Sequence, residues 1–129
     1  MTDSTNSGAK ALTIGSTVLG VDNITRASTF WMAALDYVRR DEPDDTWVVL
    51  IPREGPGAQL ALMLSETPVQ DHPRHHLDLY APDQAREVER LVELGARRVD
   101  DWDGYRPDSD FVVLEDTEGN RFCVIDKSG

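Results

Sequence analysis

Two side chains with complementary acid–base chemistry, His76 and Asp78, stand two residues apart in the segment HHLDLYA. The segment predicts a β-strand, and side chains two positions apart point to the same face of a strand. A carboxylate beside an imidazole fixes its tautomer and raises its basicity, which suits a general base. The same pair can also do no more than satisfy two buried polar groups with a hydrogen bond. The spacing leaves both interpretations open.

A second strand-like segment, RFCVID, carries two further side chains of chemical interest, Arg121 and Cys123. They are again two residues apart and so share one face. Arg121 can hold an anionic group of a ligand or form a salt bridge with one of the many carboxylates. Cys123 is the single cysteine of the chain, so an intramolecular disulfide is excluded. Its thiol is either a small apolar packing group or a reactive one.

Large aromatic or soft side chains are candidates for the wall of a binding site. They are Trp47, Met63, Tyr80, Trp102 and Tyr105. Methionine and aromatic side chains adapt to flat, apolar ligands, although each of the five can also belong to the hydrophobic core. We treat them as candidate ligand-binding residues.

These residues lie in a regular series of predicted strands and helices. The first half predicts a strand over residues 12–21, a helix over 24–36 capped by Asn23, and a hairpin of strands 46–54 and 59–66. The second half predicts a strand over 75–81, a helix over 84–95, a short strand over 96–102 and a hairpin over 108–126. The two halves align, with Trp47 opposite Phe111 and Ala61 opposite Cys123. Each half therefore predicts a βαβββ module.

The repeat predicts the domain organisation. One helix cannot cover both faces of a sheet, so two modules, residues 11–66 and 75–127, are expected to pair. We predict one α+β domain, residues 11–129, whose curved mixed sheets form a shared cleft. A continuous α+β sandwich without a cleft is the alternative. The polar residues 1–10 are expected to form a disordered tail.

Composition excludes several classes of partner. The chain has 129 residues and a formal net charge of −11, and this excess of carboxylates disfavours nucleic acid and anionic lipid surfaces. Apolar runs are too short for a membrane span, and the polar start of the chain does not resemble a secretory signal. With a single cysteine, these features favour a cytoplasmic protein with a small-molecule ligand.

Three segments carry a resemblance to a known family. They are VDNITRASTFWMAALDY, HLDLYAPDQAREVERLVELGARRV and DFVVLEDTEGNRFCVID. Together they resemble the vicinal oxygen chelate superfamily, which includes glyoxalases, bleomycin-resistance proteins and extradiol dioxygenases. The resemblance implies the glyoxalase/bleomycin-resistance fold and a homodimer.

The resemblance also locates the family's metal-ligand positions in this sequence. They fall at Ser16, Ala61, His76 and Cys123, of which only His76 is a residue type expected there. Alanine has no donor atom and serine is a poor ligand for a divalent ion. The resemblance therefore implies a pocket at these positions without a family-type metal site and without a cofactor.

Three functions remain open from the sequence. The first is a metal-independent lyase or isomerase-type enzyme, with His76 as general base, Asp78 as its orienting partner and Arg121 positioning the substrate. The second is a metal-free binding or resistance protein that sequesters an aromatic natural product. The third is a metalloenzyme with a rearranged site of His76, Cys123 and a nearby carboxylate.

Overall fold

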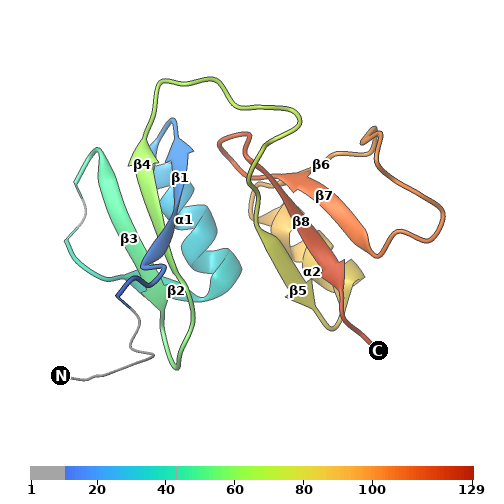
Figure 1. Ribbon diagram of the computed structural model, residues 1–129, viewed down its shortest axis with the longest axis horizontal. Coiled ribbons are helices and arrows are strands. Elements are labelled where there is room, and N and C mark those ends of the chain that lie inside the picture. Colours follow the sequence, from blue (N-terminus) through green and yellow to red (C-terminus); the bar gives the residue numbers. More distant parts are fainter. Residues whose placement is uncertain (1–10, 43) are drawn as a thin grey trace.

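The computed structural model describes residues 11–42 and 44–129; the predicted tail, residues 1–10, lies outside the described residues. The first module consists of β1 (Ser16–Val21), α1 (Ile24–Leu35), β2 (Tyr37–Arg39), β3 (Trp47–Pro52) and β4 (Gln59–Leu64). The second consists of β5 (Asp78–Ala81), α2 (Gln84–Glu93), β6 (Arg97–Arg98), β7 (Phe111–Glu115) and β8 (Arg121–Asp126). The predicted βαβββ unit is thus confirmed twice (Figure 1).

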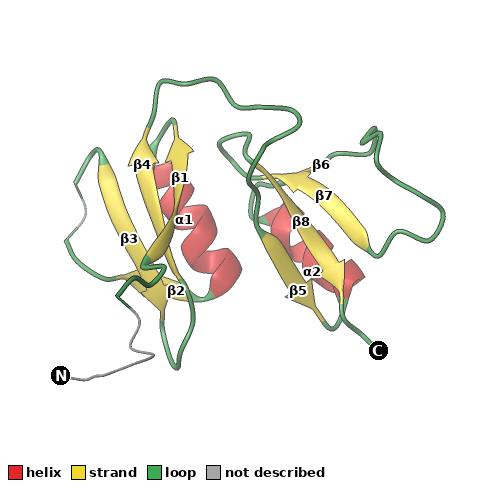
Figure 2. Ribbon diagram, viewed as in Figure 1, coloured by secondary structure: helices red, strands yellow, loops and turns green. Residues whose placement is uncertain are grey.

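Each module forms its own four-stranded mixed sheet (Figure 2). The strand order is β1-β4-β3-β2 in the first sheet and β5-β8-β7-β6 in the second. The first and last strands of each module pair in parallel, whereas the other pairs are antiparallel. The described strands of the two sheets share no ladder, so the modules are joined by side-chain contacts and by the segment between β4 and β5.

Local sequence signals explain the boundaries of α1. Asn23 caps the helix as predicted, because its side-chain oxygen accepts a hydrogen bond from the backbone N–H of Arg26 at 2.9 Å. The helix ends where Asp36 adopts a left-handed conformation, with φ of 57°. Strand β2 follows at once, and its three residues are too few for the alternation pattern to reveal. The first strand begins at Ser16, four residues later than predicted.

The two modules pack through α1. In Figure 1 this helix lies on the side of the first sheet that faces the second module. The Trp31 ring contacts Phe30 and also Phe122 of β8, with a centroid distance of 5.1 Å to the latter. At the end of α1, Arg90 of α2 donates hydrogen bonds to the carbonyl oxygens of Ala33 and Ala34. One continuous hydrophobic core therefore runs through both modules.

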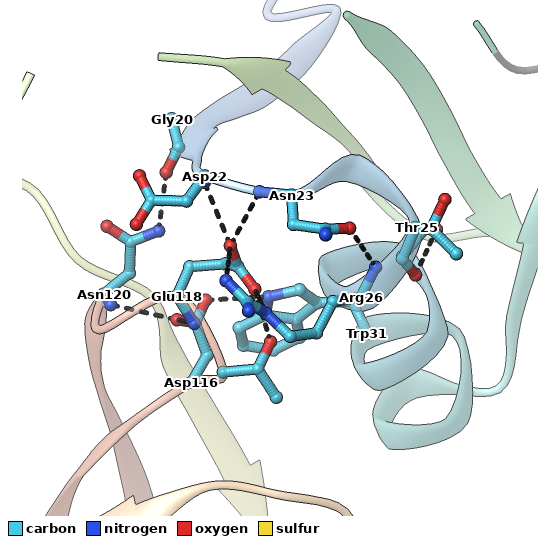
Figure 3. A network of polar contacts seen from close by, with 11 residues as sticks. Gly20, Asp22, Asn23, Thr25, Arg26, Trp31, Asp116, Glu118 and Asn120 are labelled. Atoms are coloured by element: carbon cyan, nitrogen blue, oxygen red, sulfur yellow. Dashed lines mark hydrogen bonds and ion pairs between the residues drawn. The ribbon is translucent and has the colours of Figure 1, made fainter. Parts of the chain in front are cut away.

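A network of buried and partly buried polar contacts closes the same junction (Figure 3). Trp31 Nε1 donates a hydrogen bond to Asp116 Oδ2 at 3.0 Å. The Glu118 carboxylate accepts from the backbone N–H of Asp22 and Asn23, each at 2.9 Å, and from Arg26 Nε at 2.7 Å. The turn of the last hairpin thus holds the start of α1.

These two carboxyl groups have opposite pKa shifts. Burial raises the pKa of Asp116, although the hydrogen bonds from Glu118 N–H, Trp31 and Asn120 N–H act against it. Burial opposes ionisation of Glu118 as well, but the hydrogen bonds from Arg26, Thr117 and Asn23 N–H outweigh it and lower the pKa of Glu118. Glu118 is therefore the charged centre of the junction.

In the described part of the chain, neither helix has the length and apolar character needed to cross a membrane.

Candidate functional site

The helices leave the opposite face of each sheet open. In β4, Leu60 and Leu62 point into the core, so Ala61 and Met63 lie on the other face. In the second sheet, Phe122 and Val124 point into the core, which leaves Arg121 and Cys123 of β8 on the other face. In every strand that carries a predicted site residue, that side chain thus points away from the helix of the same module.

His76, Asp78 and Cys123 meet on the open face of the second sheet. His76 Nε2 lies 3.0 Å from Asp78 Oδ1, and both side chains are partly exposed. Asp78 is the register partner of Cys123 in the parallel β5–β8 pair. One ligand atom from each of the three residues lies within 4.8 Å of the others. The structure therefore brings together the pair and the thiol that the sequence singled out.

A small cavity, here called the slot, adjoins this cluster and has a volume of about 90 Å³. It is lined by Pro73, His76, Trp102, Val113, Arg121, Phe122 and Cys123. Apart from the imidazole, the guanidinium and the thiol, its walls are apolar. Such a lining suits a small hydrophobic group with a few polar contacts at its ends.

The loop between β6 and β7 places Trp102 over the open face. Tyr105 anchors this loop, because its hydroxyl donates to the carbonyl oxygen of Val99 at 3.1 Å and accepts from Val113 N–H at 2.8 Å. The Tyr105 ring also stacks on Phe111, with a centroid distance of 5.4 Å. The loop that forms this wall of the slot is therefore fixed, because Tyr105 ties it to Val99 and to Val113 of β7.

Arg121 is fixed at the edge of the slot. Its Nε donates to Glu115 Oε2 at 3.2 Å, and its Nη1 donates to the carbonyl oxygen of Asp71 at 2.7 Å. The guanidinium carbon lies 5.9 Å from the centroid of the Trp102 ring, within the range of a cation–π contact. Arg121 lies on the predicted face and forms a salt bridge with Glu115, one of the two roles that the sequence left open for it.

Cys123 is a poor nucleophile in this environment. Burial, reinforced by the negative charge of Asp78, raises the pKa of its thiol to about 11. The thiol is therefore almost wholly protonated near neutral pH. Its placement agrees with the packing role rather than the reactive one.

A second cavity, here called the groove, has a volume of about 640 Å³ and lies at the junction of the modules, beneath the segment between β4 and β5. It was not expected, because the segment 65–77 has no periodicity that ties it to either sheet. His76 and Arg121 line this groove as well as the slot, so both are accessible from two sides.

The other predicted site residues lie elsewhere. Ser16, Trp47, Ala61 and Met63 are all on the open face of the first sheet, where Ala61 is buried and Trp47 and Met63 are partly exposed. Tyr80 lies on β5 beyond the cluster, is 71% exposed and contacts the Lys127 ammonium. Within the described residues, none of these five side chains lines the slot or the groove.

The expectation that Ser16, Ala61, His76 and Cys123 surround one hollow within a single chain is therefore corrected. Ser16, Ala61 and Cys123 lie on strands of the two sheets and His76 precedes β5, but α1 occupies the space between the two sheets. Within residues 11–42 and 44–129, neither the slot nor the groove is lined by Ser16 or Ala61.

Comparison with known proteins identifies the class. The two βαβββ modules, each with a mixed four-stranded sheet, define the glyoxalase/bleomycin-resistance fold of the vicinal oxygen chelate superfamily. Within it, the chain belongs to the family described as "Glyoxalase-like domain", whose model matches residues 16–125. No curated protein matches the chain. The resemblance predicted from the three segments is thus confirmed.

Several solved structures share the fold at low sequence identity. The fosfomycin resistance protein FosX from Listeria monocytogenes, complexed with Mn(II) and dihydroxypropylphosphonic acid, has a TM-score of 0.68 at 12% identity, covering 91% of this chain and 90% of its own. A possible glyoxalase from Bacillus cereus has a TM-score of 0.65 at 18% identity, with 89% and 99% covered. TnmS3, an antibiotic-binding protein from Streptomyces sp. CB03234, has a TM-score of 0.62 at 19% identity, with 92% and 98% covered. The fold accordingly includes enzymes and binding proteins.

The residues present do not fit the metal site that the superfamily implies. At the four family positions the donors are one imidazole and one thiol, with a serine hydroxyl and no donor at Ala61. Asp78 adds a carboxylate near His76 and Cys123, but its Oδ1 lies against the imidazole. The raised pKa of Cys123 disfavours the thiolate that a metal requires. The chemistry that these residues support is therefore that of their own side chains.

Proposed function

We propose that the protein acts on a small organic molecule bound at the slot, with His76 as the general base of a metal-independent lyase or isomerase-type reaction. The supporting observation is the 3.0 Å contact between His76 Nε2 and Asp78 Oδ1 beside the slot. When Nε2 donates to the carboxylate, Nδ1 is left as the basic nitrogen. Asp78 then fixes the tautomer and stabilises the imidazolium that forms.

The proposed chemistry is removal of a proton from a carbon next to a carbonyl group. Nδ1 of His76 accepts the proton while the C–H electron pair enters the conjugated carbonyl. An isomerase returns the proton to another atom, and a lyase completes the step by expelling a leaving group. In either case the proton exchanges with solvent while it resides on the imidazole.

Solvent exchange tests the proposal without knowledge of the natural substrate. A panel of small 2-oxo and 3-hydroxy acids is incubated with the protein in D₂O, and loss of the C–H signal is followed by ¹H NMR. His76→Ala should slow the exchange of a responsive compound by roughly a hundredfold or more. His75→Ala is the matched control, because His75 lines the groove but not the slot and should leave the rate unchanged. Undiminished exchange in His76→Ala would refute the proposal that His76 is the general base.

A second candidate function is sequestration of an aromatic natural product. It is supported by the apolar lining of the slot, with Trp102 in its wall, and by the protonated thiol of Cys123. The fold relation to an antibiotic-binding protein is consistent with it. Saturable quenching of tryptophan fluorescence by planar drugs that are recovered unchanged would favour sequestration. A panel of such drugs without a binder would count against it.

We further propose that a second copy of the chain completes the site. The open face of the first sheet exposes Val18, Trp47 and Met63, each 39–46% accessible. A two-fold pairing that lays this face on the partner's second sheet would bring Ser16 and Ala61 opposite the His76–Cys123 cluster. Light scattering should report a dimer for the native chain, and Trp47→Asp should shift it towards the monomer. A monomeric native chain would refute the pairing.

Metal independence has its own test. We expect Zn²⁺ titrated calorimetrically into chelator-treated protein to show no stoichiometric, high-affinity binding near neutral pH. Binding of one ion that disappears in Cys123→Ala would instead establish the rearranged site of His76, Asp78 and Cys123.

A further inference from the structure

We propose that Arg121 is the anion-recognition residue of the slot, and that its ligand is a small acid with an apolar end no larger than about one ring. The inference rests on the proposed function, since it takes the slot as the binding site. It goes further by naming the class of ligand, a carboxylic or similar oxyacid, and the residue that selects it.

The Arg121 guanidinium is held rigidly where a ligand can reach it. Its side chain is 13% exposed and is fixed on one edge by Glu115 and on another by the carbonyl oxygen of Asp71. Because it lines both the slot and the groove, it borders empty space on two sides. A guanidinium fixed in this way loses little further freedom on binding.

One end of this guanidinium has no hydrogen bond within the described residues. Nη2 lies 3.7 Å from Asp71 Oδ1, which is beyond hydrogen-bonding distance. Nε and Nη1, by contrast, each donate to a protein oxygen. Polar groups with so little exposure are normally paired. The Nη2 donors are therefore available to an acceptor on a bound molecule.

The nearby carboxylates do not cancel the charge of Arg121. Glu115 is shared with Arg97, whose Nη2 lies 2.9 Å from Glu115 Oε2, so two guanidinium groups face one carboxylate. The Asp71 side chain is 81% exposed, and solvent weakens its attraction. Asp78 contacts the imidazole of His76 instead. An anion at Nη2 would therefore complete the pairing.

The slot limits the rest of the ligand. Its volume of about 90 Å³ corresponds to roughly three water molecules at ~30 Å³ each. Its apolar walls, formed by Trp102, Val113 and Phe122, favour a hydrophobic group over those waters. A small branched alkyl group matches this space and a single ring enters it in part, and Arg121 at its edge is placed for the acidic end.

Three probes of nearly equal shape separate charge from shape. Phenylacetate, phenylacetamide and phenethylamine carry the same ring with an anionic, a neutral and a cationic end. Their affinities are measured by isothermal titration calorimetry and by ¹H–¹⁵N NMR shifts of the native protein. Phenylacetate should bind about tenfold or more tightly than the amide, because a charge-assisted hydrogen bond replaces a neutral one. The amine should bind more weakly than both.

Matched variants assign the selectivity to one residue. Arg121→Met should reduce the affinity for phenylacetate to that for the amide, while Arg121→Lys should keep part of the preference. Arg97→Met is the control, because Arg97 also pairs with Glu115 but lines neither the slot nor the groove. The Arg97→Met variant should lose much less of the preference for the acid than Arg121→Met, because it keeps the Arg121 guanidinium and changes only how Glu115 is shared.

Equal affinities for the acid and the amide in the native protein would overturn the inference, as would absence of binding by all three probes. An equal loss in Arg97→Met would also overturn it, because the effect would then come from Glu115. These results leave the proton-exchange test of His76 untouched. A charge-selective slot with unchanged exchange in His76→Ala would, conversely, refute the general base alone.

Discussion

The indole Nε1 of Trp31 donates a 3.0 Å hydrogen bond to Asp116 Oδ2, and the two residues lie 85 positions apart in the chain. Trp31 is 1% exposed and belongs to α1, whereas Asp116 begins the turn between the last two strands. The contact therefore joins the helix of one module to the final hairpin of the other. It places a carboxyl group inside the junction on which the relative position of the two open faces depends.

Replacing Trp31 with Phe should destabilise this junction. The variant loses ring volume and leaves a buried carboxyl group without one of its donors, at a cost of about 2–4 kcal/mol in the free energy of unfolding. The pKa of Asp116, measured by NMR, should rise further, because this donor lowers it in the native protein. Trp102→Phe is the control, since Trp102 Nε1 makes no hydrogen bond within the described residues. A loss of comparable size in the free energy of unfolding of Trp102→Phe would contradict the explanation.

The contribution of Glu118 should depend on pH. Its pKa is lower in the folded protein than its ordinary value of 4.5, so its ionisation stabilises the fold above that pH and the stabilisation is lost as the pH falls. Glu118→Gln should lower the free energy of unfolding by about 1–3 kcal/mol near pH 7. In urea titrations from about pH 7 to about pH 3, the difference between the two proteins should shrink on the acid side. A stability difference that grows as the pH falls would contradict the prediction that ionised Glu118 stabilises the fold.

Removing the Tyr105 hydroxyl should loosen the wall of the slot. Tyr105→Phe leaves the Val113 N–H without its acceptor, which should cost about 1–3 kcal/mol of stability. Hydrogen exchange at the Val113 amide should accelerate, and phenylacetate should bind more weakly because Trp102 is less firmly held. The Tyr80 hydroxyl, on a side chain that is 71% exposed, makes no hydrogen bond within the described residues, so Tyr80→Phe should leave both measurements unchanged.

The reactivity of Cys123 should follow a high pKa. Alkylation by iodoacetamide should be slow near pH 8, where roughly one thiol in a thousand is ionised, and should rise as the pH approaches 11. Asp78→Asn should lower the pKa and speed alkylation at intermediate pH, because it removes a negative charge beside the thiol. Asp126→Asn removes a negative charge from β8, the strand of Cys123, and should not change the rate of alkylation. Rapid alkylation of the native protein at neutral pH would contradict the buried, protonated thiol.

The sequence predicts most of the fold because the fold repeats. Each helix has a capping residue and an apolar stripe, and each hairpin has a turn signal, so two matching halves reinforce one another. Residues Tyr37–Arg39 escape detection because three residues cannot establish an alternation. The faces of Asp78 and Cys123 are also predictable, since a strand has only two faces, whereas His76 lies before β5, which begins at Asp78 rather than at residue 75 as predicted.

The sequence could not predict how the modules sit together. Periodicity shows that Trp31 points to a core, but not that this core includes Phe122 of the other module. For the same reason it could not show that Pro73 and Val113 line the slot, or that a groove lies beneath the linking segment. Those contacts depend on long-range packing, which leaves no local pattern in the chain.

The separation of the two sheets has a consequence for how the protein can change over evolutionary time. Because each sheet has a hydrogen-bonded ladder of its own, a substitution on one open face leaves the backbone pairing of the other module intact. Duplication of a half-length ancestor would produce such an arrangement, and its two halves would then be free to diverge.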